Sequence, residues 1–373
     1  MKILYSCLSK SWGGMEMFTL TAVQQLLKRN IEVELLCFEN SRLHKVAEKQ
    51  NIILHTLKAS GYFHPVQSFN LSSIIRNGKF NLIHTQASKD LWLLVPALKI
   101  IGSKIPLFLT KQVGSFIVKK DKLHQWIYNR ITYALAISEV IKRNLLDTCP
   151  ITEDKILLLH NAVDTKRFDP EKIDKHKVRK EFCFTDDEIV LGMLARFSPG
   201  KGHEEILFAA EKLSKKFSNL KFFIVGEASR GEEAYANQIK KLADDYNLKN
   251  IVFGGFRSDT PEVLAALDIF CFPSHSEAFG IALVEAMAMG IPSVCSNSDG
   301  ILDIAIDGET SFLFEKKNGN DLAEKLEQLI SSKEKREQFG KLSRERAVKF
   351  FDLDYLTEKV ISIYEQALKK NHE

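Results

Sequence analysis

The sequence lacks the features of several protein classes. Its six cysteines are spread along 373 residues without a CxxC pair or a neighbouring histidine, so neither a disulfide framework nor a zinc site is indicated. No stretch reaches the roughly 18 uncharged apolar residues of a membrane-spanning helix, and the start, MKILYSCLSKSWGG, is too polar for a signal peptide. We therefore expect a cytoplasmic protein with reduced thiols. The cysteines are Cys7, Cys37, Cys149, Cys183, Cys271 and Cys295.

Nucleic-acid motifs are also missing. The sequence contains no helix-turn-helix, zinc-knuckle or RNP-like pattern, and we expect no nucleic-acid partner. The net charge of +4 is unevenly spread, because residues 1–181 carry 28 Lys and Arg against 16 Asp and Glu, whereas residues 182–373 carry 24 against 32. A basic first half favours contact with an anionic membrane surface or a phosphorylated acceptor. Solvated surface lysines are the alternative explanation.

Strand-like apolar runs alternate with helix-like segments in both halves of the chain. Such alternation predicts parallel sheets in an α/β fold. The pattern pauses in a charged stretch between residues 168 and 188 and then restarts, so we expect two doubly wound, Rossmann-like domains at residues 1–175 and 176–353. The runs are KILYSC, VELLCF, IILHTL, NLIHTQ, PLFLTK, YALAIS and KILLLH, then IVLGML, FFIVGE, IVFGGF, IFCFPS, PSVCSN and SFLFEK.

The segment FPSHSEAFGIALVEAMAMGIPSV, residues 272–294, carries the strongest functional signal. Its helix-forming part follows a Phe-Gly turn and ends at a Gly and a Pro, which places Glu277 before a helix and Glu285 in its second turn. The first N–H groups of a helix have no internal partner, so backbone near Phe279, Gly280 and Ile281 can receive a phosphate. Each carboxylate can accept hydrogen bonds from a sugar diol. Together these groups predict a nucleotide-sugar site.

A second candidate clamp for phosphate lies upstream, in LGMLARFSPGKGHEEIL. Arg196 and Lys201 flank a Ser-Pro-Gly turn between a strand and a helix, at the edge where doubly wound sheets bind ligands. A solvated loop is the alternative for this pair. Near the start, Gly13 and Gly14 follow the first strand and would let backbone approach a phosphate without a Cβ in the way. A double glycine by itself can also be only a turn.

These blocks resemble, in order and spacing, the motifs of retaining glycosyltransferases of the family 4 type. The residues that carry the resemblance are the Glu-x7-Glu pair, the Arg-x4-Lys pair, HNAVDTKRFDP at residues 160–170 and the Gly-Gly turn of the first block. The resemblance covers nearly the whole chain and implies the GT-B fold, in which two Rossmann-like domains face each other. It also implies that the C-terminal helix, residues 354–373, crosses back to pack on an acceptor-binding first domain, and that residues 176–353 bind the donor.

The resemblance further implies roles for the donor-site residues. Arg196 and Lys201 would stabilise the departing diphosphate, Glu277 would bind the transferred sugar and Glu285 the ribose. The base would be recognised near Gly255, Phe256 and Arg257, although Arg257 as a cap of the turn is the alternative. UDP is favoured as the nucleotide by its frequency in the family. The donor is then a co-substrate, and no cofactor is expected.

The acceptor side departs from the family pattern. Gln86 stands where the second of two histidines is common, although the first, His84, is present, and Lys111 occupies a segment where many members carry a histidine. Lys111 would suit an anionic acceptor, in keeping with the basic first half. Glu16 would lie near the acceptor or act as an ordinary residue of a first helical turn. These residues are candidates for acceptor binding.

No catalytic metal is predicted. The DxD pattern of Asp352 and Asp354 precedes the last helix, where capping and first-turn roles explain both aspartates. No candidate for an enzyme nucleophile is evident, so the resemblance implies a front-face substitution with retention. The expected reaction transfers a hexose to a glycan or lipid-linked hydroxyl, in polysaccharide or lipopolysaccharide synthesis. Another GT-B enzyme, such as an epimerase or a phosphorylase, and a non-catalytic sugar-binding protein remain alternatives.

Residues 115–134, SFIVKKDKLHQWIYNRITYA, mix aromatic and aliphatic side chains with lysines and arginine. Phe116, Ile117, Trp126 and Tyr128 alternate with basic residues, as in a helix or loop that touches anionic lipid. A core-facing helix with a solvated basic side explains the same pattern. Peripheral attachment to the inner face of the cytoplasmic membrane is therefore an open alternative to a purely cytoplasmic location.

Overall fold

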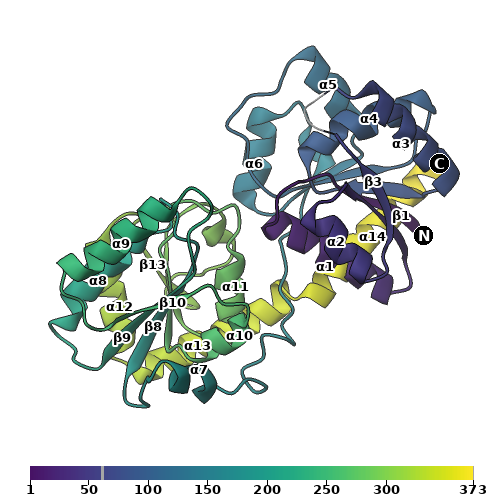
Figure 1. Cartoon of the computed structure of the whole chain (residues 1–373). Coiled ribbons are helices and arrows are strands. Elements are labelled where there is room, and N and C mark those ends of the chain that lie inside the picture. The colour runs from purple at the N-terminus through teal and green to yellow at the C-terminus, as the bar shows by residue number, and fades with distance from the viewer. Residues whose placement is uncertain (60–62, 373) are drawn as a thin grey trace. The chain divides into compact units, whose positions relative to one another are not determined.

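The computed structural model describes residues 1–59 and 63–372, which form two compact units (Figure 1). The first unit contains Met1–His160 and the chain from Leu356 onward, and the second contains Asn161–Tyr355. The sequence predicted a boundary at residue 175. By their contacts, residues 161–175 group instead with the second unit.

The first unit is built on a seven-stranded parallel sheet with the order β3-β2-β1-β4-β5-β6-β7. β1, β4 and β5 are buried along almost their whole length because helices cover both faces of the sheet. The strands are β1 (Lys2–Cys7), β2 (Glu32–Phe38), β3 (Ile53–Leu57), β4 (Leu82–Thr85), β5 (Leu107–Lys111), β6 (Tyr133–Ala136) and β7 (Ile156–Leu158).

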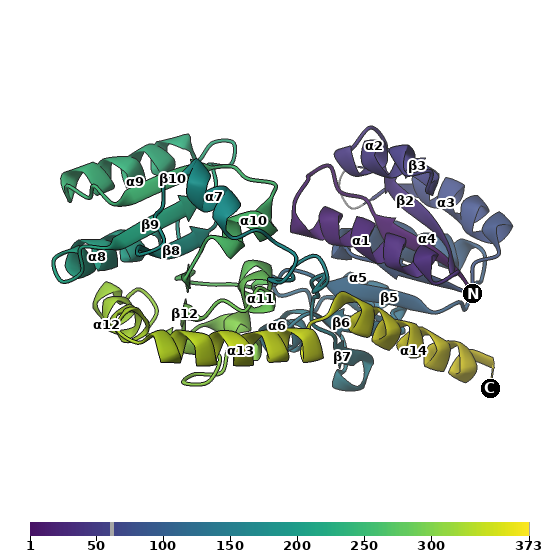
Figure 2. The same cartoon turned by 90° about the horizontal axis from the view of Figure 1, so that it is seen from below.

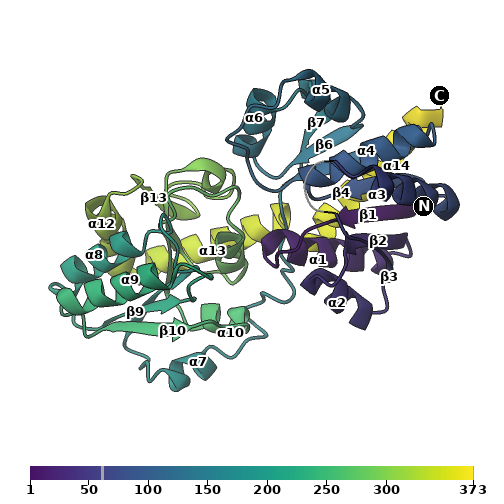
Figure 3. The same cartoon turned by 45° about the horizontal axis from the view of Figure 1, so that its top comes forward.

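The helices of the first unit form two layers. Apolar residues of α1 (Gly14–Lys28), α2 (Arg42–Lys49) and α14 (Leu353–His372) share one core with β1 and β2. α3 (Pro65–Gly78) and α4 (Leu91–Ile100) pack side by side on the other face (Figure 3). α5 (Lys122–Asn129) and α6 (Glu139–Thr148) complete the unit. Their starts follow from local sequence, since the side chains of Asp121 and Ser138 accept backbone N–H bonds as N-caps.

The C-terminal helix belongs to the first unit through a buried aromatic anchor. Tyr364 of α14 is fully buried, and its ring lies 5.0 Å from that of Phe108, edge to face. Its hydroxyl is hydrogen-bonded to Nδ1 of His84, whose Nε2 lies 2.7 Å from Oγ1 of Thr110. An ion pair of 2.5 Å between Arg29 and Glu358 adds a contact to α1. The expected packing of the last helix on the first domain is confirmed.

The second unit is built on a six-stranded parallel sheet with the order β10-β9-β8-β11-β12-β13. Its strands are β8 (Ile189–Leu194), β9 (Leu220–Val225), β10 (Ile251–Gly255), β11 (Ile269–Phe272), β12 (Ser293–Ser296) and β13 (Ser311–Phe314). Its helices are α7 (His176–Glu181), α8 (His203–Ser214), α9 (Glu233–Asp245), α10 (Thr260–Ala265), α11 (Ile281–Ala288), α12 (Gly319–Ile330) and α13 (Lys333–Phe350).

Two helical layers also cover the second sheet (Figure 2). α8, α9 and α12 share an apolar core with one face of the strands, and α11 packs against α13. All thirteen strands expected from the sequence are present, and the predicted fold of two parallel, doubly wound sheets is confirmed. Among helices of the described residues, none is both long and apolar enough to cross a membrane.

The anchor of α14 gives a stability prediction. Tyr364→Phe removes the hydroxyl that pairs with His84 and leaves a buried ring nitrogen without that partner, which should lower the free energy of unfolding by about 1–3 kcal/mol. The matched control is Tyr133→Phe, because the Tyr133 hydroxyl accepts a hydrogen bond from the exposed Nζ of Lys370 at 3.3 Å. Urea unfolding measures both. Equal losses in the two variants would contradict the anchor.

Candidate functional site

The candidate site of the second unit lies at the switch point of its sheet. β8 and β11 are neighbours, while the chain continues outward from β8 through β9 and from β11 through β12. The loops that leave the carboxyl ends of β8 and β11 therefore meet at one edge of the sheet, which is where open α/β sheets bind ligands. Arg196 and Lys201 lie on the first loop and Glu277 on the second.

Lys201 and Glu277 form an ion pair, with 2.5 Å between Nζ and Oε1. Both side chains are largely but not fully buried, at 23% and 17% exposure. Gly202 makes this approach possible, because its φ is +86° and a Cβ there would lie 2.4 Å from the carbonyl oxygen of Pro273. The structure thus joins two residues that the sequence could only place on separate loops.

Arg196 is the more exposed cation of the site. Its guanidinium donates to Oγ of Ser229 at 2.9 Å, which ties it to the loop after β9. Glu232, beside Ser229, accepts from the hydroxyl of Ser198, and this hydrogen bond lowers the pKa of Glu232. The turn that carries Arg196 is therefore supported from the neighbouring loop, and the guanidinium keeps a solvent-facing side.

The start of α11 has the form expected of an anion site. Gly280 is the N-cap residue, with φ +123°, and its carbonyl accepts the N–H groups of Leu283 and Val284. Ile281 begins the helix, and the amides that precede these two N–H groups are the ones without an intrahelical acceptor. Phe279 is buried and packs edge to face on Phe351 at 5.8 Å, which fixes the direction of the turn.

Glu285 lies in the second turn of α11, as the sequence predicted. Loss of solvation raises the pKa of its carboxyl to about 7, although the positive charge of Arg167 opposes this shift. A carboxyl with a pKa in this range changes its charge near neutral pH. The sequence did not reveal Arg167 as a neighbour, because no motif spacing links a residue before α7 to one in α11.

Arg257 is occupied by protein carboxylates. Its guanidinium makes two hydrogen bonds to Asp259, at 2.8 and 2.6 Å, and it also pairs with both oxygens of Glu181. These hydrogen bonds raise the pKa of Arg257 and lower the pKa of both acids. The side chain therefore holds the turn after β10 to α7, in line with the capping alternative. Phe256, with 68% exposure, is the side chain of this turn that offers a free surface.

The glycines of the first unit lie on the loop between β1 and α1. Gly13 has extended backbone, and a Cβ at Gly14 would meet nothing within 4 Å, so neither glycine is required by packing inside the protein. Glu16 is buried, and its Oε2 accepts the N–H of Gly13 at 2.8 Å. Glu16 thus acts as a first-turn residue that caps α1, which was the second of its two expected roles.

His84 and Lys111 are both buried in the first unit. Both ring nitrogens of His84 are engaged by Tyr364 and Thr110, and burial lowers its pKa to about 3, so it stays neutral and holds α14 to the sheet. We therefore leave His84 out of the proposed acceptor site. Burial, and then the charge of Lys119, lowers the pKa of Lys111, whose Nζ donates to the Ser88 hydroxyl at 3.1 Å.

The DxD pattern has the capping role expected from the sequence. Oδ1 of Asp352 accepts the N–H of Tyr355 at 3.1 Å, and Asp354 pairs with Lys166 at 2.6 Å. Within residues 1–59 and 63–372, no group of three or more His, Cys, Asp or Glu side chains could hold a metal ion.

The raised pKa of Glu285 predicts a pH-dependent stability. A folded pKa of about 7 lies above the ordinary value of 4.5, so the wild type loses stability as pH rises between these values. Glu285→Gln has no carboxyl to ionise there. The free energy of unfolding of the variant, relative to that of wild type, should therefore rise from about pH 5 to about pH 8. Urea unfolding at both pH values measures the difference. A constant difference, or one that shrinks, would contradict the assignment.

Family profiles match the two units separately. Residues 12–167 match the profile Glycosyltransferase Family 4, and residues 174–346 match the profile Glycosyl transferases group 1. Among similar curated proteins is the capsular polysaccharide biosynthesis glycosyltransferase CapM of Staphylococcus aureus, which is 25% identical over 94% of this chain and 93% of its own.

Solved structures of glycosyltransferases share the fold. A glycosyltransferase from Rickettsia africae superposes with a TM-score of 0.90 at 23% identity, covering 99% of this chain and 98% of its own. HepE of Anabaena, in complex with UDP and glucose, has a TM-score of 0.80 at 21% identity, covering 98% and 99%. At these identities the likeness establishes the fold. With the two profile matches, it shows that the chain belongs to the group 1 glycosyltransferases of the GT-B fold.

Proposed function

We propose that this protein is a retaining glycosyltransferase that moves a hexose-type sugar from a nucleotide-diphosphate sugar to a hydroxyl of a glycan or lipid-linked acceptor. The observation that carries the proposal is the Lys201–Glu277 ion pair at the switch point of the second sheet, just before α11. A cation and a carboxylate thus meet a few residues before a helix whose first N–H groups lack intrahelical acceptors. The lysine ammonium and the helix N–H groups can bind a diphosphate, and the carboxylate can accept hydrogen bonds from a sugar diol.

In the proposed complex the diphosphate lies at the start of α11, near Gly280 and Ile281. Lys201 moves partly away from Glu277 and binds the phosphate oxygens. Glu277 then accepts hydrogen bonds from the sugar hydroxyls. Glu285 accepts the ribose hydroxyls in its ionised form. UDP is the nucleotide of choice, supported by the likeness to HepE, whose structure contains UDP and glucose. Phe256, which is 68% exposed, would stack on the base.

The proposed reaction needs no enzyme nucleophile. The acceptor hydroxyl attacks the anomeric carbon on the face that the diphosphate leaves, so the C1–O bond to phosphate breaks while the new C1–O bond forms. The acceptor proton passes to an oxygen of the leaving diphosphate. Arg196, Lys201 and the N–H groups of α11 stabilise the negative charge of that diphosphate, each donor contributing about 3 kcal/mol. These fixed positive groups would serve in place of a metal ion.

The proposed setting is the synthesis of cell-surface polysaccharide or lipopolysaccharide. The likeness to CapM, named for capsular polysaccharide biosynthesis, supports this setting, as does the basic character of residues 1–181. Lys111, buried beside Ser88 at the carboxyl end of β5, is the candidate cation for an anionic acceptor. Gly13 and Gly14 would allow close approach of a bound ligand to the loop after β1.

The donor proposal is tested by binding and turnover together. Titration calorimetry with UDP-, GDP- and ADP-glucose should select one base, and Lys201→Ala should lower turnover by a factor of about 100 or more. The matched control is Lys212→Ala, which removes a lysine of α8 whose Nζ lies 3.9 Å from Glu324. The anomeric proton signal of the product reports retention.

Three results would contradict the donor proposal. Binding of no nucleotide sugar by the folded protein would favour a non-catalytic role or a different chemistry. Conversion of the donor without transfer to any acceptor would point to another GT-B enzyme. An equal loss of turnover in Lys201→Ala and Lys212→Ala would show that turnover does not depend on the proposed site.

We also propose that the first unit attaches to anionic membrane. The loop between β5 and α5 exposes three consecutive apolar side chains, Phe116 at 105%, Ile117 at 70% and Val118 at 64%. The loop is held by Asn144, whose side chain bonds both the N–H and the carbonyl of Ser115, at 2.7 and 2.9 Å. An ordered loop that presents apolar tips is unusual at a surface in contact only with water.

The charges around the loop support anionic lipid as the proposed partner. Lys120 and Lys122 are exposed directly beside the apolar tips, a combination that suits the headgroup region of an anionic bilayer. The sequence had grouped Tyr128 with this surface, but Tyr128 is buried and its hydroxyl accepts from Cys149 at 3.3 Å. The lipid-facing part is thus the loop, while α5 faces the core through Ile127 and Tyr128.

Vesicle co-sedimentation tests the attachment. The double variant Phe116→Ser and Ile117→Ser should bind vesicles that contain phosphatidylglycerol about tenfold or more weakly, because it lacks two apolar side chains that would insert into the bilayer. Vesicles of phosphatidylcholine alone should bind weakly. Ile53→Ser is the matched control, since Ile53 is 61% exposed on edge strand β3, at the far side of the sheet. Unchanged binding of the loop variant would refute the proposal.

A further inference from the structure

A largely buried Glu–His pair, with side chains 10% and 22% exposed, lies in the segments that carry Lys201 and Glu277. Oε1 of Glu205, in the first turn of α8, lies 2.8 Å from Nε2 of His275, on the loop that leads from β11 to Glu277. Glu205 is only 9% exposed. The proposed function uses neither residue.

The pair connects a rigid helix to an irregular loop. Around Glu205, α8 is fixed in the core by Ile206 and Leu207, both fully buried. His275 lies in a segment without helix or strand. A hydrogen bond from α8 to His275 therefore transmits the position of the helix to the loop that carries Glu277.

Backbone hydrogen bonds also hold the loop that carries His275 and Glu277. The N–H of His275 donates to the carbonyl of Gly200 at 2.8 Å, and the carbonyl of Glu277 accepts the N–H of Gly300 at 3.0 Å. Gly200 directly precedes Lys201. His275 thus contacts the turn that carries Lys201 through its backbone and α8 through its ring, and it stands two residues before Glu277.

The Glu205 carboxylate is kept at an energetic cost. Among the described residues, its second oxygen, Oε2, has no hydrogen-bond partner and is shielded from solvent. A buried charge with an unpaired oxygen is less stable than a well-packed apolar side chain at the same position. Such a cost is expected where a residue serves a site rather than the stability of the fold.

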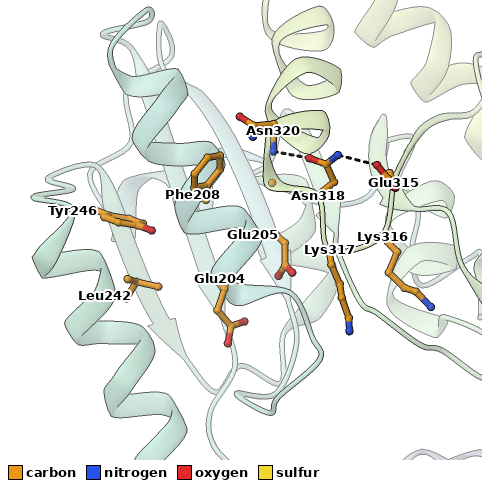
Figure 4. Close-up of a pocket in the computed structure, with 11 residues that line it drawn as sticks. Glu204, Glu205, Phe208, Leu242, Tyr246, Glu315, Lys316, Lys317, Asn318 and Asn320 are labelled. Carbon is orange, nitrogen blue, oxygen red and sulfur yellow. Dashed lines mark hydrogen bonds between the residues drawn. The ribbon is translucent and has the colours of Figure 1, made fainter.

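Neighbouring Glu204 provides a contrast. Figure 4 shows Glu204 and Glu205 on the same helical turn, along one side of an open pocket of about 570 Å³ that residues 315–320 line from the other side. Glu204 accepts from the hydroxyl of Tyr235 at 2.8 Å and so contacts α9. Of these two adjacent glutamates, Glu204 thus bonds Tyr235 of α9, whereas Glu205 bonds His275 of the loop after β11.

We propose that Glu205 and His275 are positioning residues that hold Lys201 and Glu277 in the geometry needed for sugar transfer. This proposal rests on the proposed glycosyltransferase function. The pair does not touch the substrate. It restricts the loop between β11 and α11, so that the carboxylate of Glu277 and the ammonium of Lys201 are in place before the donor binds.

Glu205→Leu separates positioning from stability. The variant should change the melting temperature little, because it removes a partly unpaired carboxylate and leaves Nε2 of His275, whose side chain is 22% exposed, to bond water. Its kcat for UDP release from the donor should fall by about tenfold or more, with KM for the donor changed by less than about threefold. Glu205→Gln, which can still hydrogen-bond His275, should recover most of kcat. Glu204→Leu, with the same charge removed from the same turn, should keep wild-type kcat.

Either of two kinetic results would overturn the proposal. One is a wild-type kcat in Glu205→Leu, and the other is a kcat that falls only together with the melting temperature. If the wild type turns over no donor, the proposed function fails, and ligand-free crystal structures of wild type and Glu205→Leu decide instead. Loss of the Lys201–Glu277 contact in the variant would support positioning, and an unchanged contact would refute it.

Discussion

Parallel pairing of β8 with β11 is the constraint on which the account depends. Because both strands run in the same direction, their carboxyl ends open at one edge of the sheet, and the chain must leave that edge on opposite sides. Lys201 and Glu277, far apart in sequence, meet there at 2.5 Å. The start of α11 adds helix N–H groups to the same region. The proposed site for a diphosphate and a sugar thus depends first on the topology of the sheet and then on its side chains.

The sheet of the first unit has the same strand order around its switch point, between β1 and β4, but different side chains lie there. Asp90 is buried where β1 and β4 diverge, and its Oδ2 accepts hydrogen bonds from Ser6, Thr85 and the N–H of Leu8. Burial raises the pKa of Asp90 to about 6. Internal hydrogen bonds thus hold Asp90 at the corresponding edge of the first sheet, while exposed apolar and charged side chains lie on the loop after β5.

The sequence predicted the sheets, the helix at Ile281 and the place of Glu285, because these depend on periodicity, glycine and proline signals and local chain direction. It did not predict contacts that depend on side-chain reach between elements. Arg257 looked available to a ligand, yet Glu181 of α7 and Asp259 occupy it. His84 was a candidate for acceptor binding, yet the hydroxyl of Tyr364 in α14 holds its Nδ1. No spacing rule links such partners, since they come from separate elements that only the folded core brings together.

A crystal structure of the protein with bound UDP-sugar tests the central claim most directly. The account predicts diphosphate density at the N-terminal end of α11, within hydrogen-bond distance of Lys201 and Arg196, with the sugar hydroxyls on Glu277 and the ribose on Glu285. The Lys201–Glu277 contact should open or lengthen as the ligand takes its place. A diphosphate bound elsewhere, with this ion pair intact, would contradict the account.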